Sequence, residues 1–218
     1  LQNSLDFTLT HTQSDDVPII KINRIKINKD KFKNLIGDKF QEWILDSKQI
    51  KDTYFLKKEF EKNDDVEVLL FEDFNTTGIK GGPLPHHIDM KDGTRNDYYA
   101  FIWDVGATKD KGEDKGGSIG IGRLTFGLSS KINTFFVYTK QNFKIHLVKT
   151  IKNYNKTYFT GLANFGQSKS DPFLDPIARF GVDGENFGIP GKPYPIDNEN
   201  DLGIIRKNFN LKRKENEP

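Results

Sequence analysis

Three short segments carry the side chains that are best suited to binding ions and phosphates. In the first, the amide of Asn3 and the carboxylate of Asp6 are three residues apart, which places both on one face of a helix. The second is an apolar stretch that runs into Asp73, and the third is a glycine turn followed by Arg123. Amide and carboxylate oxygens ligate hard cations, and glycine turns at helix starts bind phosphate. Together they favour a nucleotide site in one pocket.

The order of these segments resembles the GHKL ATPases, the family of gyrase B subunits, large heat-shock chaperones, histidine kinases and mismatch-repair ATPases. In that family a helix with an E-x-x-x-N pattern supplies a Mg²⁺ ligand and the hydrolytic base. A strand-end Asp followed by glycines holds adenine, and a later Gly-x-Gly turn wraps the phosphates. By this resemblance Asn3 is the metal ligand, Asp73 holds adenine, and Gly120 with Gly122 holds phosphate. The implied cofactors are ATP and Mg²⁺.

The other residues of these segments are expected to complete the cofactor-binding set: Asp6, Thr77, Gly78, Gly117 and Arg123. A cation at a helix start opposes the local dipole, so Arg123 is more easily explained by a bound anion than by stability. Asn75 stands where the family usually has a glycine, and asparagine tolerates positive φ better than most residues. Each segment also has a plainer interpretation: a surface asparagine, an acidic strand end and a glycine loop that caps a helix.

The Glu of the family pattern would lie before Leu1, so no catalytic residue is assigned within this sequence. We therefore expect the chain to be a piece of a longer protein, and to hydrolyse ATP slowly or not at all by itself. The predicted function is an ATP/Mg²⁺-binding module of a larger GHKL-type ATPase. Closure of its lid over ATP would promote formation of a homodimer, or would change its contacts with an effector protein or domain. The alternatives are a non-catalytic interaction module and a nucleic-acid-binding domain.

The amino-acid composition excludes only some of these possible functions. The 33 basic and 31 acidic residues give a formal net charge of +2, so bulk charge does not predict nucleic-acid or membrane binding. The absence of cysteine excludes disulfides and thiolate metal sites. No apolar run has the length of a membrane span, and no signal-peptide pattern opens the chain. We expect a cytoplasmic protein without membrane contact.

The resemblance implies an α/β fold, a two-layer sandwich of helices on a mixed, mostly antiparallel sheet of the Bergerat type. The expected ATP-binding domain spans residues 1–170, with a helical insertion at about 30–62 and a loop-like lid at about 79–116. Residues 171–218 are predicted to be an irregular C-terminal extension leading to a missing downstream part. Hydrophobic patterning adds strands at 17–27, 66–71, 132–140, 143–150 and 157–164, and helices at 120–131 and 198–210. The strand at 66–71 is predicted to be buried on both faces.

Overall fold

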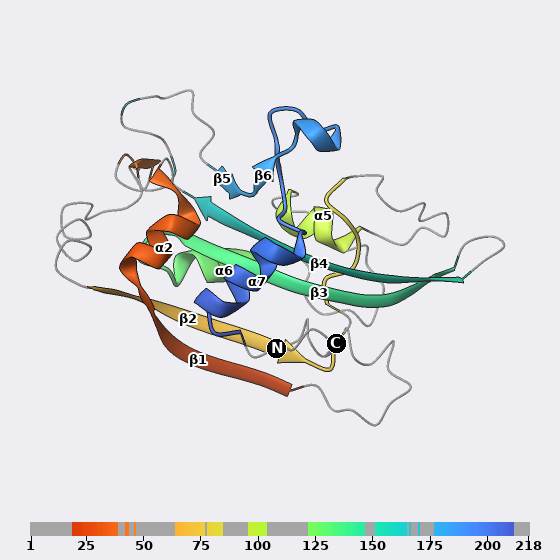
Figure 1. Cartoon of the computed structure of the whole chain (residues 1–218), viewed down its shortest axis with the longest axis horizontal. Helices are drawn as coiled ribbons and strands as arrows, with labels where there is room; N and C mark the ends of the chain where they lie inside the picture. The colour runs from red at the N-terminus through yellow and green to blue at the C-terminus, as the bar shows by residue number, and fades with distance from the viewer. Residues whose placement is uncertain are drawn as a thin grey trace.

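In the residues that it describes, the computed structural model of the chain has three antiparallel sheets and several short helices (Figure 1). The sheets have the strand orders β1-β2, β3-β4-β5 and β6-β7. The structure describes residues 19–38, 42–43, 46, 64–76, 78–84, 96–103, 122–146, 151–164, 166, 170 and 177–211.

Strands β1 (Ile19–Asn28) and β2 (Asp65–Phe74) pair along their full length, from Ile19 opposite Phe74 to Asn28 opposite Asp65. Isoleucine and valine at alternate positions favour this pairing, because β-branched side chains suit a pleated surface. The inner face packs on the core, whereas on the outer face Leu69 and Phe71 remain 53% and 47% exposed. The predicted burial of the second strand on both faces is therefore wrong. A continuous apolar run occurs in strands that are covered on both faces and also in strands with one exposed face. The run alone therefore did not distinguish the two cases.

Strands β3 (Thr134–His146) and β4 (Ile151–Asn164) form a long hairpin that crosses most of the molecule (Figure 1). The sequence pattern predicted three strands here, and the structure has two longer ones. Strand β5 (Ile177–Phe180) pairs with the end of β4. Strands β6 (Val182–Asp183) and β7 (Pro193–Tyr194) flank a 3₁₀ turn, within the stretch that was predicted to be irregular.

Asparagine side chains cap the starts of α2, α5 and α7. Asn28 accepts hydrogen bonds from the first backbone amides of α2 (Lys29–Ile36), which opens the predicted insertion. Asn198 accepts from Asp201 N at 2.9 Å and caps α7 (Glu199–Asn208), as the pattern predicted. Helix α6 (Gly122–Leu128) follows the glycine segment and is shorter than predicted. Helix α5 (Asp97–Ile102) lies within the segment that was predicted to be a loop-like lid.

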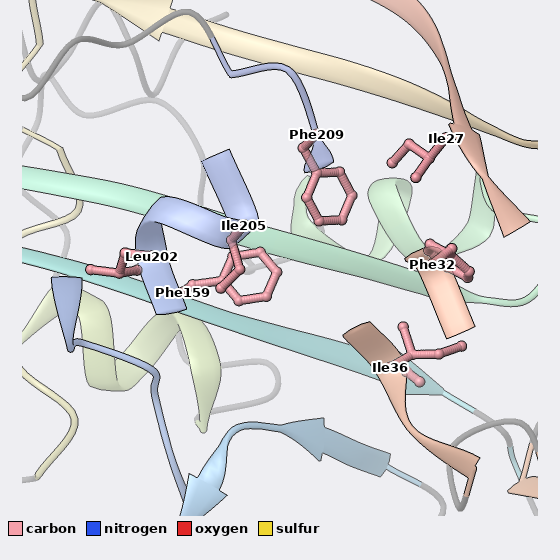
Figure 2. Packing of buried hydrophobic residues seen from close by; sticks show 8 residues of the cluster. Ile27, Phe32, Ile36, Phe159, Leu202, Ile205 and Phe209 are labelled. Carbon is pink, nitrogen blue, oxygen red and sulfur yellow. The ribbon is translucent and has the colours of Figure 1, made fainter. Parts of the chain in front are cut away.

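The main core forms where the sheets meet α2 and α7 (Figure 2). Phe159 of β4 stacks on Phe136 of β3, with ring centroids 5.7 Å apart and planes 7° apart. Fully burying an aromatic or aliphatic side chain stabilises a fold by about 1.5–3 kcal/mol. The buried members come from four separate parts of the chain: Ile27, Phe32, Ile36, Phe159, Ala163, Leu202, Ile205 and Phe209. Helix α7 is thus part of the same core as β1 and β4.

The predicted two-layer sandwich of helices on one mixed sheet is wrong. In the part of the chain that the structure describes, all strand pairs are antiparallel and they belong to three separate small sheets. Among the described residues, more lie in strands than in helices, and the described helices form no continuous layer over a sheet. Hydrophobic periodicity located most of the strands, but it carries no information on which strands share a sheet.

Candidate functional site

The strand-end carboxylate predicted to bind a ligand lies at the end of β2, where a tight turn begins. Asp73 is half-buried, and Thr76 Oγ1 donates a hydrogen bond to Asp73 Oδ2 at 3.3 Å. Asn75, between them, has φ 60°, a left-handed conformation that asparagine tolerates better than most residues. A carboxylate oriented in this way can accept hydrogen bonds from an amine of a ligand.

The neighbouring carboxylate points to the opposite side of the strand. Glu72 lies on the inner face of β2, where it is 9% exposed and accepts a hydrogen bond from Asn23 Nδ2 at 3.4 Å. Asp73 lies on the outer face, as alternation along a strand requires. The two acidic residues therefore have different surroundings, and only Asp73 belongs to the turn.

The chain after this turn is attached to β3. Ile79 N donates a hydrogen bond to Thr139 Oγ1 at 3.0 Å, and Gln141 Nε2 donates to the carbonyl oxygen of Ile79. Gly78 has φ 69°, and a Cβ there would lie 3.0 Å from the carbonyl carbon of Lys140 and closer still to its oxygen. Close packing on β3 thus requires glycine at this position. These contacts fix the turn relative to the long hairpin.

A further attachment comes from Asn96, which sequence reasoning missed. Its side chain accepts from Gly82 N at 3.1 Å and donates to the carbonyl oxygens of Gly82 and Leu84 at 3.0 and 2.8 Å. The same Oδ1 accepts from Tyr99 N at 3.0 Å and so caps α5. An asparagine directly before the segment Asp97–Ile102 was a usable helix-start signal. The predicted lid is therefore held at two of its described parts by one amide.

Helix α6 lies on the same side of β2 as Asp73. The rings of Phe71 and Phe126 meet edge to face with centroids 5.5 Å apart. Phe71 and Asp73 are two residues apart and share the outer face of the strand. Phe126 lies one turn after Gly122, the first residue of α6. The structure thus brings the strand that carries Asp73 next to the helix that follows the predicted phosphate turn.

Asn3, Asp6, Thr77, Gly117 and Gly120 lie outside the residues that the structure describes. Gly122 is the first residue of α6, and Arg123 is the second. The structure describes the backbone of Arg123 but not its side chain.

The described segments contain neither a group of metal ligands nor a membrane-spanning helix. No group of three or more histidine or acidic side chains that could hold a metal occurs among them. Within these same segments, no helix combines the length and apolar character needed to cross a bilayer.

Comparison with known proteins identified no relative: no protein-family model, curated protein or solved structure matches this chain.

Proposed function

We propose that the chain binds an adenine nucleotide and that Asp73 recognises the exocyclic amine of the base. The observation that carries this proposal is the turn after β2, with a carboxylate held by Thr76 and a left-handed Asn75 two residues after it. It fits the strand-end Asp of the GHKL ATPases, which the sequence resembles. The proposal depends on this turn and on the order of the motifs, because the observed sheets do not form the sandwich expected of that family.

The described residues suit the base-recognition part of such a site. The Asp73 carboxylate can only accept hydrogen bonds, and an exocyclic amine can only donate them. The half-buried position of Asp73 strengthens such a bond relative to one in water. Gly78 has a structural role here, because it lets the next residues pack on β3 and thereby fixes the turn.

The phosphate and metal contacts are assigned by resemblance alone. Gly117, Gly120, Gly122 and Arg123 would face the phosphates, and Asn3 would ligate Mg²⁺ beside them. A bound Mg²⁺ neutralises charge on the phosphate oxygens. In the full ATPase, nucleotide binding would order the lid and promote dimerisation or a change in partner contacts.

Calorimetric titration with ATP and Mg²⁺ tests the proposal through Asp73→Asn. An amide keeps one oxygen to accept from Thr76, so the turn is retained, but its NH₂ opposes the amine of adenine. A hydrogen bond to a charged group is worth about 1.5–3 kcal/mol. We therefore expect Kd to rise roughly tenfold to a hundredfold.

The matched control is Glu72→Gln, which makes the same chemical change on the opposite face of the strand. Its ATP affinity should equal that of the wild type once circular dichroism shows that both variants are folded. Equal ATP affinity for the wild type and Asp73→Asn, or no binding by the wild type, would refute the adenine role. A greater loss with Glu72→Gln would place any nucleotide on the inner side.

A further inference from the structure

The part of the chain that forms α6, β3 and β4 carries positive charge and no negative charge. From Gly122 to Asn164 the sequence contains one arginine, six lysines and no acidic residue. Of the 33 basic residues of the chain, the other 26 lie elsewhere together with all 31 acidic residues, so the remainder has a net charge of −5. The overall charge of +2 therefore conceals a basic segment within an acidic protein. Such a separation of charge produces a local field that attracts polyanions.

The base of the long hairpin is anchored in the core. Tyr138 of β3 packs against the main core cluster, and Phe159 of β4 belongs to it. Arg206 of α7 donates a hydrogen bond to the Tyr138 hydroxyl at 3.2 Å. Beyond this point the two strands stay paired over residues 140–146 and 151–157, which we call the distal hairpin. It is about 20 Å long and runs towards the side of the molecule away from α2 (Figure 1).

The register divides the distal hairpin into two different faces. Residues directly opposite each other share a face, and so do residues two apart along a strand. On one face Phe143 is paired with Tyr154, and Ile145 is paired with Lys152. The other face ends at the pair of His146 and Ile151. Its remaining positions are all hydrophilic, and we call them the polar face: Lys140, Asn142, Lys144, Asn153, Asn155 and Thr157.

The residue types of the polar face match the chemical groups of a nucleic-acid duplex. Lysine binds phosphate oxygens and the O6 and N7 atoms of guanine, and asparagine makes a bidentate pair with adenine. In the register Lys144 lies opposite Asn153, so a cation and an amide are neighbours at the middle of this face. Two strands about 4.8 Å apart fit into the major groove of DNA, which is about 12 Å wide. A ribbon of this length can follow roughly six base pairs.

Other polyanions fit the polar face less well. Proteins that bind single-stranded nucleic acid stack the bases on aromatic residues, but Phe143 and Tyr154 lie on the opposite face. Binding at a lipid surface combines cations with a row of apolar residues, whereas here Ile151 lies beyond the end of the polar face. An acidic polypeptide matches the charge but does not have the shape of a groove.

We propose that the polar face of the distal hairpin binds in the major groove of double-stranded DNA. The lysines of this face bind phosphate oxygens and base edges, and the asparagines bind base edges. Because phosphate contacts supply much of the affinity, binding depends strongly on salt concentration. The proposal uses residues other than Asp73 and does not depend on adenine binding.

The test uses the 218-residue chain and a fluorescent DNA duplex of mixed sequence, about two helical turns long. Binding is followed by fluorescence anisotropy over a range of salt concentrations and without ATP. An RNA duplex of the same sequence carries the same phosphate charge, but its major groove is deep and narrow and cannot be read. We expect the DNA duplex to bind on the order of tenfold more tightly than the RNA duplex or the single strand.

Two lysines of the hairpin provide a matched pair of variants. Lys144→Gln removes a charge from the polar face, and Lys152→Gln removes the same charge from the opposite face. Lys144→Gln should weaken DNA binding on the order of tenfold and lower the slope of affinity with salt by about one. Lys152→Gln should have a smaller effect on both. Lys31→Gln, at an exposed position of α2, should leave both unchanged.

Four kinds of result would overturn the proposal. The first is no binding of the DNA duplex by the wild type at low salt. The second is equal binding of DNA and RNA duplexes, or equal effects of Lys144→Gln and Lys152→Gln, since either would mean charge attraction without contact in the groove. The third is equally effective displacement of the duplex by polyglutamate of the same charge or by anionic phospholipid vesicles. The fourth is displacement by ATP with Mg²⁺, which would place the DNA at the nucleotide site.

Discussion

Replacing Gly78 by alanine tests whether the turn after β2 is held by close packing on β3. The new Cβ would lie 3.0 Å from both the Lys140 carbonyl carbon and Thr139 Oγ1, a distance that is tighter than most real Cβ contacts. The Lys140 carbonyl oxygen would be closer still, so the backbone at Gly78 must move. Movement would also strain the hydrogen bond from Ile79 N to Thr139 Oγ1.

The expected cost has two parts. Placing an L-residue at φ 69° costs about 1–2 kcal/mol. Overpacking against a neighbour that cannot move adds about 1–3 kcal/mol. Gly78→Ala should therefore lower the free energy of unfolding by roughly 2–5 kcal/mol. That is a large fraction of the stability of a typical domain.

Gly188→Ala is the matched control. Gly188 has φ 75°, and a Cβ there would meet nothing within 4 Å. It should cost only the backbone part, about 1–2 kcal/mol. Urea unfolding followed by circular dichroism gives both values, provided that the slope with denaturant is unchanged. Equal costs for the two variants, within about 0.5 kcal/mol, would refute the packing argument at Gly78.

Two further predictions concern the sheet of β1 and β2 and the turn that follows β2. Asn75→Val should lower the free energy of unfolding by at least about 1 kcal/mol, because a β-branched residue is strained at positive φ. Asn75→Gly should change it by less, and equal urea midpoints for the two variants would contradict the assigned conformation. Arg24→Gln should raise the pKa of Glu67 towards 4.5, measured by NMR titration, because the guanidinium hydrogen bond favours the charged carboxylate. This pair contributes its full stabilisation above the unfolded pKa, and the contribution is lost as pH falls through the lowered folded pKa, so near neutral pH it is present and does not vary with pH.

Much of the local structure could be predicted from the sequence because its causes are local. β1 is rich in isoleucine, and α7 starts at a capping asparagine, so both elements follow from residue type. The left-handed Asn75 followed from the tolerance of asparagine for positive φ. Helix α5 was missed although Asn96 precedes it, because the glycines and prolines before it favoured a loop.

The arrangement of the sheets could not be predicted in the same way. The predicted strands at 132–140 and 143–150 leave Gln141 and Asn142 as a break between them. In the structure Gln141 is fully buried within β3, and its Nε2 donates to the carbonyl oxygen of Ile79. The partner is 62 residues away in sequence. A polar residue whose side-chain NH₂ group donates to a distant backbone carbonyl can continue a strand that its own neighbours would end.

This dependence on distant partners also explains why the candidate site was predicted only in part. The identity of Asp73 and the conformation of Asn75 are properties of a few consecutive residues. The orientation of the turn depends on Thr139 and Gln141 of β3, and the next segment depends on Asn96. These are neutral polar side chains without a sequence motif, and each bonds to a backbone group. A buried polar group without such a partner is costly, so these bonds determine where the chain can pass. The candidate site therefore depends on the side chains that position the turn as much as on the carboxylate of Asp73. Only the carboxylate could be recognised from the sequence.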